Sequence, residues 1–460
     1  MDPERAETYL RMLAESELRR LAPASRHDPR SARIWLAATA LIAAGGIDAE
    51  TAQRVVADLE DAVALRAGMP PGVSGMASGY WLARVRPQRA AGPADPGGQL
   101  CAVPAGVTLP LLPEHEGWRG EYRLLALVTA DGYAALTLAA RWVARAGRPA
   151  SRHPSHAPLD QVGAVDDQGR SYQGSLWDRG VEGRDWWDGH LRLSPAPPPG
   201  TRWLDISPEA GGPQARIDLA GPPAPAQVTV DAAPSASAAA RLLDCAAEAL
   251  LGAGRSAAMT GVSSRVAQVA QALTEGGAVP AGEPALARLA ALAAGLGLDL
   301  GVPGAARAPV PDAWASILAG RGACDGPQAV ASFAVILPDV DGARFALAGL
   351  RSWRQGATLH VLARGWQPAG WGWLAFGGRL DDSPPDPSVS WQARDSTGRW
   401  HMVDQMNWGD GGDGTTQIQA HLTPPLHPAA TSLEVIITGV SSRVRATVPL
   451  HWQASPASSR

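Results

Sequence analysis

The stretch AVDDQGRSY at residues 164–172 is followed by LSPAPPPGTRWLDI at residues 193–206, and both patterns return later in the chain. The later copies are QARDSTGRW at residues 392–400 and LTPPLHPAATSLEV at residues 422–435. Matching residues of the two copies keep one offset of 229 positions: Asp166 and Asp395, Gly169 and Gly398, Pro195 and Pro424, Leu204 and Leu433. Two separate blocks that keep one offset indicate the internal duplication of a whole domain.

The residues around both copies alternate between apolar and polar, as half-buried β-strands do. Leu136-Thr-Leu138 and Arg202-Trp-Leu-Asp-Ile206 show this alternation, and turn residues separate the short runs about every ten positions. This rhythm is typical of an antiparallel, immunoglobulin-like β-sandwich. Apolar residues at helical spacing precede each copy, at residues 3–22 and 236–299. The sequence therefore predicts an α+β protein, a tandem duplication of a helical segment followed by an immunoglobulin-like antiparallel β-sandwich.

Stretches rich in Gly, Pro and Ser divide the chain into segments. We expect an N-terminal helical segment at 1–66, a linker at 67–102, a first β-sandwich at 103–220, a linker at 221–235, a second helical segment at 236–325, a second β-sandwich at 326–454 and a disordered tail at 455–460. The helical segments resemble each other only in ALIAAGGIDA at 40–49 and ALTEGGAVPA at 272–281, which Ala/Leu-rich helices produce easily.

The composition is that of a folded protein with several cores. The chain has 460 residues, 45% of them hydrophobic and 18% charged, and its net charge is −4. This charge predicts no general attraction to nucleic acid or to acidic membranes. Every basic side chain apart from histidine is arginine, so a Walker A lysine, a Schiff-base lysine and a kinase-type lysine are all excluded.

The sequence points to a cytoplasmic protein. The opening MDPERAETYL has no basic segment followed by an apolar one, so we do not expect a signal peptide. The longest apolar stretches, near 36–44 and 286–296, are too short to span a membrane. Cys101, Cys245 and Cys324 are widely scattered, which argues against a disulfide framework or a structural zinc site.

The repeated Asp-x-x-Gly element is expected to be a turn between two strands. Asp166 and Asp395 can accept backbone N–H bonds locally, and Gly169 and Gly398 can take a positive φ. A calcium loop is the alternative, but calcium takes six to eight oxygen ligands. A second weak metal candidate is DQMNWGDGGDG at 404–414, where Asp410 and Asp413 lie among glycines. Acidic glycine-rich runs are usually hairpin tips, so we expect no metal and no cofactor.

A resemblance to known proteins rests on three stretches: AVDDQGRSY, RLSPAPPPGTRWLDI and the N-terminal RAETYLRMLAESELRRL. Together they resemble an uncharacterised group of high-GC bacterial cytoplasmic proteins in which a helical segment precedes a β-sandwich. The second copy departs from this pattern, because Thr431-Ser432 stands where the first copy has Arg202-Trp203. The resemblance implies a fold and no chemistry.

The sequence contains neither a GxSxG nor an HExxH enzyme signature. His153 and His156 lie three apart in a Pro/Ser-rich stretch without a third ligand nearby. A hydrolase would need groups from distant segments, and Asp404, Asp410 and His401 are the candidates. The sequence thus favours a binding protein over an enzyme.

Tryptophan is unusually frequent, with 17 Trp against 3 Phe and 5 Tyr. We expect most of these indoles to fill the cores, because large aromatic side chains dominate core packing. Trp186 and Trp187 are the exception, since adjacent residues on a strand face opposite ways and one indole must lie outside the core. Trp186, Trp187 and Trp408 are therefore the candidate binding residues.

Three functions remain open. The first is a non-catalytic protein-interaction scaffold whose loops or edge strands bind a protein partner or a second copy of the chain. The second is a carbohydrate-binding module that uses exposed Trp residues, and the third is a hydrolase with a site assembled across the fold. The sequence favours the first, with no binding of nucleic acid and no insertion into a membrane.

Overall fold

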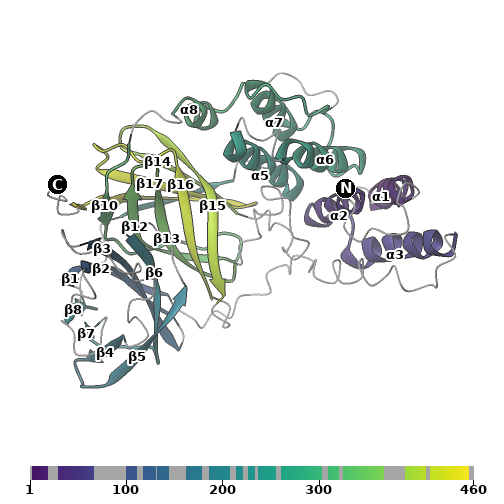
Figure 1. The fold of residues 1–460 in the computed structure, drawn as a ribbon. Coiled ribbons are helices and arrows are strands. Elements are labelled where there is room, and N and C mark those ends of the chain that lie inside the picture. The colour runs from purple at the N-terminus through teal and green to yellow at the C-terminus, as the bar shows by residue number, and fades with distance from the viewer. Residues whose placement is uncertain are drawn as a thin grey trace.

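The computed structural model describes residues 3–18, 29–66, 100–110, 118–130, 132–144, 162–178, 186–207, 214–220, 226–233, 237–254, 261–302, 309–320, 325–366, 389–410 and 415–454. Within these ranges the protein is of the α+β class, with seven α-helices and two antiparallel β-sheets (Figure 1). No helix in the described ranges is both long and apolar enough to cross a membrane.

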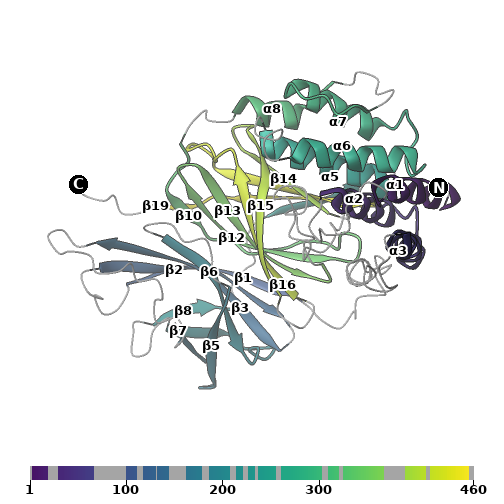
Figure 2. The same ribbon diagram turned by 45° about the vertical axis from the view of Figure 1, so that its right-hand side comes forward.

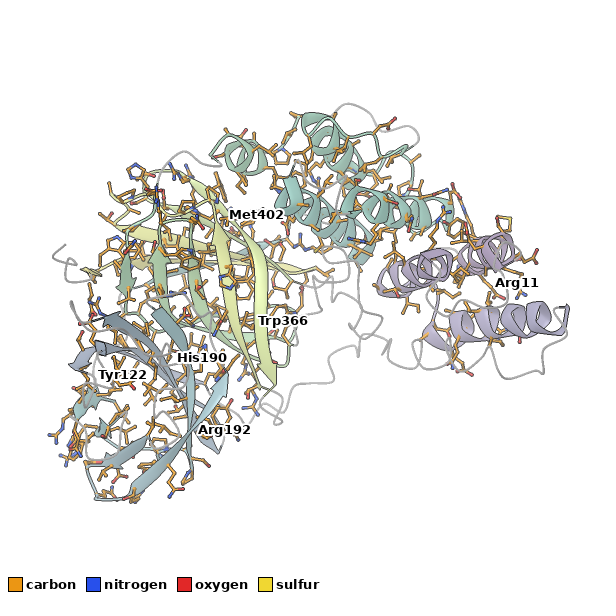
Figure 3. All side chains as sticks on the ribbon, in the orientation of Figure 1. Arg11, Tyr122, His190, Arg192, Trp366 and Met402 are labelled. Atoms are coloured by element: carbon orange, nitrogen blue, oxygen red, sulfur yellow. The ribbon has the colours of Figure 1, made fainter. Side chains whose placement is uncertain are left out.

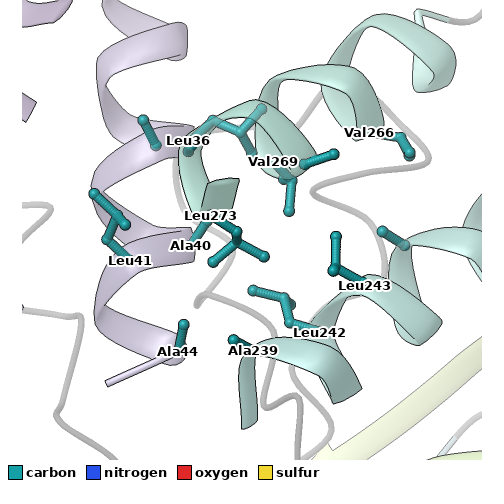
Figure 4. Close-up of a cluster of buried hydrophobic side chains, with 14 of the residues drawn as sticks. Leu36, Ala40, Leu41, Ala44, Ala239, Leu242, Leu243, Val266, Val269 and Leu273 are labelled. Carbon is teal, nitrogen blue, oxygen red and sulfur yellow. The ribbon is translucent and has the colours of Figure 1, made fainter. Parts of the chain in front are cut away.

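The helices gather on one side of the molecule and share one hydrophobic core (Figures 1 and 2). They are α1 (Pro3–Leu18), α2 (Pro29–Ala43), α3 (Ala49–Arg66), α5 (Ala238–Ala253), α6 (Val262–Glu275), α7 (Pro284–Gly295) and α8 (Asp312–Gly320). Figure 4 shows α2, α5 and α6 meeting in this core, where Leu41 of α2 and Leu273 of α6 are fully buried. The two helical segments of the sequence thus pack against each other.

Paired glycines end α2 and α6 in the same way. Gly45 has φ +70° and Gly277 has φ +74°, a conformation that glycine adopts without steric penalty. The N–H of Gly46 donates to the carbonyl of Leu41 at 2.8 Å, and the N–H of Ala278 donates to that of Leu273 at 2.8 Å. These bonds satisfy carbonyls that the ends of the helices would otherwise leave unpaired.

The first sheet has eight strands in the order β1-β2-β3-β6-β5-β4-β7-β8. The strands are β1 (Cys101–Pro110), β2 (Trp118–Ala130), β3 (Tyr133–Ala144), β4 (Gly163–Asp166), β5 (Ser171–Asp178), β6 (Trp186–Ser194), β7 (Trp203–Ser207) and β8 (Ala215–Asp218). The two end strands, β1 and β8, approach each other. The sheet therefore curls around a core that includes Leu124, Leu136 and Leu191.

The second sheet has eleven strands, ten of them in the order β19-β10-β12-β13-β16-β15-β14-β17-β18-β9, with β11 paired to β12. The strands are β9 (Gln227–Ala232), β10 (Ala329–Ala331), β11 (Val335–Ile336), β12 (Arg344–Trp353), β13 (Gly356–Arg364), β14 (Ser390–Asp395), β15 (Trp400–Asp410), β16 (Thr415–Thr423), β17 (Ser432–Thr438), β18 (Ser442–Pro449) and β19 (Trp452–Ala454). Phe345, Trp366 and Trp391 pack edge to face or tilted in its core, as expected for tryptophan as a core residue.

Among the described residues, neither half has the two separate sheets that an immunoglobulin-like sandwich requires. In each half the strands are hydrogen-bonded into one continuous curled sheet, and the order β2-β3-β6-β5-β4-β7-β8 of the first matches β12-β13-β16-β15-β14-β17-β18 of the second. Sequence alternation does not separate these architectures, because both bury one face of every strand.

The two curled sheets pack on each other through their outer faces. Ala126 and Val128 of β2 meet Ala346 and Ala348 of β12 in a small hydrophobic cluster. Each of these two strands has a register shift at the contact, between Leu124 and Ala126 in β2 and between Leu347 and Leu350 in β12. The sheets therefore form one layered body, with the helices beside the second sheet (Figure 2).

Candidate functional site

The strand β9 lies at one end of the second sheet and forms an open edge there. All six of its residues, Gln227 to Ala232, are exposed to solvent. In the sequence it follows the first sheet, but it pairs antiparallel with β18 of the second, with Gln227 opposite Thr447 and Ala232 opposite Ser442. Among the described residues no strand pairs with its other side. An edge of this kind presents N–H and C=O groups to which another strand can hydrogen-bond.

Two valines of β9 lie on the core side of the sheet although they are solvent-exposed. Val230 is opposite Val444 and Val228 is opposite Ala446, and residues directly opposite each other share one face of a sheet. Val444 and Ala446 are fully buried in the second core, whereas Val230 is 55% exposed and Val228 is 36% exposed. The apolar face of the sheet therefore continues from the buried core onto β9, where its side chains are exposed to solvent.

The single charged side chain of β9 is already in ion pairs. The Asp231 carboxylate lies 3.0 Å from Nε of Arg445 and 3.4 Å from Nη2 of Arg443, both on β18. Surface pairs of this kind contribute little to stability, but they neutralise the strand. The open edge consequently offers backbone groups and valine side chains with no net charge.

A second cluster, which we call the buried polar layer, joins the two sheets. Asp188 of β6 accepts a hydrogen bond from Nε of Arg351 of β12 at 2.9 Å, and Nε2 of His360 of β13 lies 3.3 Å from the same carboxylate oxygen. Burial alone raises the pKa of a carboxyl group. Here Arg351 and His360 outweigh burial and hold the pKa of Asp188 at about 2.

Histidines extend the buried polar layer across the sheet contact, and Figure 3 labels His190. The Nε2 atom of His190 lies 3.4 Å from Nδ1 of His360, and its Nδ1 lies 3.2 Å from Oγ1 of Thr137 on β3. Burial lowers the pKa of His190 well below its usual range, with His360 acting in the same direction. His421 of β16 lies nearby, with its Nδ1 3.2 Å from Oγ1 of Thr358 on β13, and burial lowers its pKa to about 4. These two imidazoles are therefore neutral at physiological pH.

The buried polar layer suits a structural role better than a catalytic one. Asp188, His190 and His360 are at most 1% exposed and Arg351 is 5% exposed, so a substrate has no access to them in this structure. A buried charge pair with good geometry fixes the alignment of the elements that supply it, because removal of one partner leaves the other uncompensated. The layer joins β6 of the first sheet to β12 and β13 of the second.

A third cluster lies where α5 packs against the second sheet. Arg241, Asp244 and Glu248 of α5 are all at least 95% buried, and Asp244 forms a two-pronged ion pair with Arg288 of α7 at 2.7 Å. The Glu248 carboxyl accepts a hydrogen bond from Nε2 of Gln392 on β14 at 2.9 Å. Burial raises the pKa of Glu248 to about 7, although Arg241 opposes this shift. This carboxyl group therefore titrates near neutral pH.

The repeated Asp-x-x-Gly elements are turns, which confirms the prediction. The Asp166 carboxylate accepts the N–H groups of Gln168 and Arg170, at 2.9 and 2.8 Å, as well as the Tyr172 hydroxyl at 2.7 Å. Asp395 accepts the N–H groups of Thr397 and Arg399 at 2.9 and 3.1 Å. Gly169 and Gly398 have φ +77° and +89°. Both carboxylates are thus occupied by their own turns.

The predicted binding residues are placed only in part. Trp186 and Trp187 begin β6, opposite Arg141 and Ala140 of β3, and Trp408 lies in β15 opposite Ile418 of β16. The structure describes only the backbone at these three positions, so their role in binding remains a prediction.

The weak metal candidates lie at or beyond the limits of the described residues. Asp410 ends β15, and Asp413 lies outside the described residues, as do His153 and His156. Within the described part of the chain, no group of three or more His, Cys, Asp or Glu side chains is arranged to hold a metal ion.

The three candidate hydrolase residues all lie on β15. Asp404 and Asp410 both lie on β15, and six residues of extended strand separate them by about 20 Å. His401, on the same strand, is fully buried, where its Nδ1 lies 2.6 Å from the Pro424 carbonyl oxygen and its Nε2 lies 3.4 Å from Asp395. His401 and Asp395 therefore support the turn and the proline crossing.

Neither β9 nor the buried polar layer is predicted by the sequence. β9 lies within residues 221–235, which we expected to be a linker, although Val228 and Val230 alternate with polar residues as strand residues do. Asp188 and His190 alternate with Gly189 and Leu191, and this pattern is typical of a solvated strand face. Nothing in a local pattern reveals that a second sheet covers that face.

Comparisons with known proteins give no family for this chain. No family model matches the sequence, and no curated protein matches it significantly. The crystal structure of a conserved domain protein from Bacillus anthracis aligns with 7% identity over 77% of this chain and 80% of that chain, with a TM-score of 0.17. A score this low supports no argument about fold or function.

Proposed function

We propose that this protein is a non-catalytic interaction scaffold that binds an extended protein segment along β9. The observation that carries the proposal is the open edge itself: six exposed residues in a strand that is paired on one side among the described residues. Strand addition to such an edge obtains affinity from main-chain hydrogen bonds and specificity from alternate side chains. Val228 and Val230 supply the apolar contacts for those side chains.

Binding is favoured over catalysis because the clusters of titratable side chains are buried inside the protein. Asp188 of the buried polar layer is 0% exposed, and Glu248 of the α5 cluster is 5% exposed. The carbohydrate-binding alternative depends on Trp186, Trp187 and Trp408 and is a separate prediction. A cytoplasmic location is part of the proposal, because the scattered cysteines fit a reducing compartment.

We also propose that the chain arose by duplication of a unit made of helices and one sheet. The matched strand orders of the two sheets support this origin, as do the turns at Asp166 and Asp395, which share their hydrogen bonds at the common offset of 229 positions. The matched ends of α2 and α6, at Gly45 and Gly277, extend the similarity to the helices. The edge strand β9 lies outside the matched order.

Crosslinking mass spectrometry in native cytosol tests the interaction proposal. We compare the intact chain with Val230→Lys, which places a charge at the centre of the open edge, and with Val165→Lys as a matched control. Val165 is also a strand valine, 37% exposed, but it lies on β4 inside the first sheet. Because the chain has no lysine, a carboxyl-reactive crosslinker is used, and we expect crosslinks from Asp231 to a specific protein that Val230→Lys loses and Val165→Lys keeps. Identical crosslinks in all three proteins would refute the proposal.

A further inference from the structure

We infer that the strand which adds to β9 is β9 of a second copy of this chain, so that the protein forms a two-fold symmetric dimer with one continuous sheet across both subunits. This inference rests on the proposed function, because it uses the same open edge. It specifies the partner, which the proposed function leaves unspecified.

The side chains of β9 are complementary to themselves in one antiparallel register. When Thr229 lies opposite Thr229 of the second copy, Val228 lies opposite Val230 and Gln227 lies opposite Asp231. Directly opposed residues share one face of a sheet, so the four valines of the two strands meet on the core side. Two opposed threonines meet on the other face, where Thr–Thr pairs are favourable.

Charge does not oppose this pairing. Like charges directly opposite each other destabilise a sheet, and in this register Asp231 faces an uncharged glutamine. Asp231 is in addition within 3.0 Å of Arg445 and 3.4 Å of Arg443 in its own subunit. The chain contains no lysine, the residue that most often protects edge strands from pairing with each other.

Proline residues limit the edge to the length that two copies share. Pro225 precedes β9 in the sequence and Pro234 follows it, and proline cannot donate a hydrogen bond to a neighbouring strand. A partner strand is therefore restricted to residues 226–233, and a second β9 has the same limits. A two-fold axis through this segment gives a closed dimer instead of an open fibre.

Disulfide trapping tests the dimer and its register in the full-length chain. Thr229→Cys is introduced in a background in which Cys101 and Cys324 are replaced by serine, while the buried Cys245 is kept. Opposed residues in antiparallel strands have Cβ atoms about 4.5–5.5 Å apart, close enough for a disulfide after small adjustments. We expect Thr229→Cys to give a covalent dimer on oxidation and the control Val165→Cys to stay monomeric.

Sedimentation equilibrium of the unmodified chain gives an independent measurement. We expect a monomer–dimer equilibrium whose dissociation constant rises at least about tenfold in Val230→Lys, since the symmetric interface contains the substitution twice and each factor of ten needs only about 1.4 kcal/mol. Val165→Lys is expected to leave the equilibrium unchanged.

The outcomes separate this inference from the proposed function. A monomeric chain whose Thr229→Cys variant gives no more covalent dimer than Val165→Cys overturns the self-association. If Val230→Lys still loses a cytosolic crosslink in that case, the edge binds a different protein and the proposed function stands. If the crosslinks are also unchanged, both ideas fail.

Discussion

Glu248 provides a test of how α5 is held against the second sheet. In the unfolded chain its carboxyl group has the ordinary pKa of 4.5, whereas burial raises the pKa to about 7 in the folded protein. The folded state therefore favours the protonated form, and stability falls as the pH rises from about 4.5 to about 7. At higher pH the full penalty remains, about 3 kcal/mol at 1.36 kcal/mol for each pH unit between the two pKa values.

The substitution Glu248→Gln removes this titration and keeps the shape of the side chain. The amide oxygen of the substituted side chain can still accept the hydrogen bond that Gln392 donates to Glu248 Oε1 at 2.9 Å. Near pH 4 the variant and the parent are expected to be equally stable, because both side chains are then neutral. Above pH 7.5 we expect the variant to be more stable, by up to about 3 kcal/mol.

Hydrogen exchange measured by mass spectrometry resolves this effect locally, because local opening of α5 and β14 is separated from unfolding elsewhere. The quantity of interest is the difference in opening free energy between variant and parent at pH 5 and at pH 8. Glu50→Gln on the exposed first turn of α3 is the matched control for the loss of one charge. A difference that is the same at both pH values would refute the assignment of a raised pKa to Glu248.

Three further substitutions test other parts of the structure. Arg351→Met leaves the Asp188 carboxylate buried without its guanidinium partner, and we expect the free energy of unfolding in urea to fall by about 3–5 kcal/mol. The second substitution Asp188→Leu in the same chain should restore most of this loss. Equal stability of Arg351→Met and the parent would contradict the buried charge pair. Gly349→Val adds a side chain at φ +94°, where a Cβ atom would lie 2.8 Å from Cβ of Leu125. We therefore expect faster hydrogen exchange in β2 and β12. Unchanged exchange in these strands would contradict the tight contact between the sheets. Asp166→Ala removes the acceptor of three hydrogen bonds. We expect the free energy of unfolding, measured by thermal unfolding, to fall by about 2–3 kcal/mol. A loss below about 0.5 kcal/mol would show that the turn does not depend on the carboxylate.

The sequence was most informative where local chemistry decides the structure. Asp166 and Gly169 form the turn that the Asp-x-x-Gly pattern predicts, because the side-chain acceptor and the positive φ are both local requirements. The glycine pair after α2 ends that helix for the same reason. The division into helical and strand-forming segments is likewise visible in the period of the apolar residues.

The sequence was least informative where distant segments cover each other. His190 lies on a strand face that reads as solvated, but it is 1% exposed because the second sheet covers that face. The sequence predicts that the N-terminal helices belong to the first half of the chain, yet α2 packs against α6 of the second half (Figure 4). Alternation shows which residues share a face, and the partner of that face is fixed only by tertiary packing.

Helices cover the second sheet at β15, and two residues of β15 differ from their counterparts on the matching strand β5 in a way that explains this difference. Trp400 and Met402 of β15 pack into the helical core, whereas Ser171 and Gln173, 229 positions earlier on β5, are polar and exposed. Burial of two large apolar side chains supplies several kcal/mol for docking a helical layer, and Ser and Gln supply none. The halves thus share a strand order while their outer surfaces differ, and β9, which joins only the second sheet, is part of that difference. The proposed binding edge therefore belongs to a surface that sets the second half apart from the first.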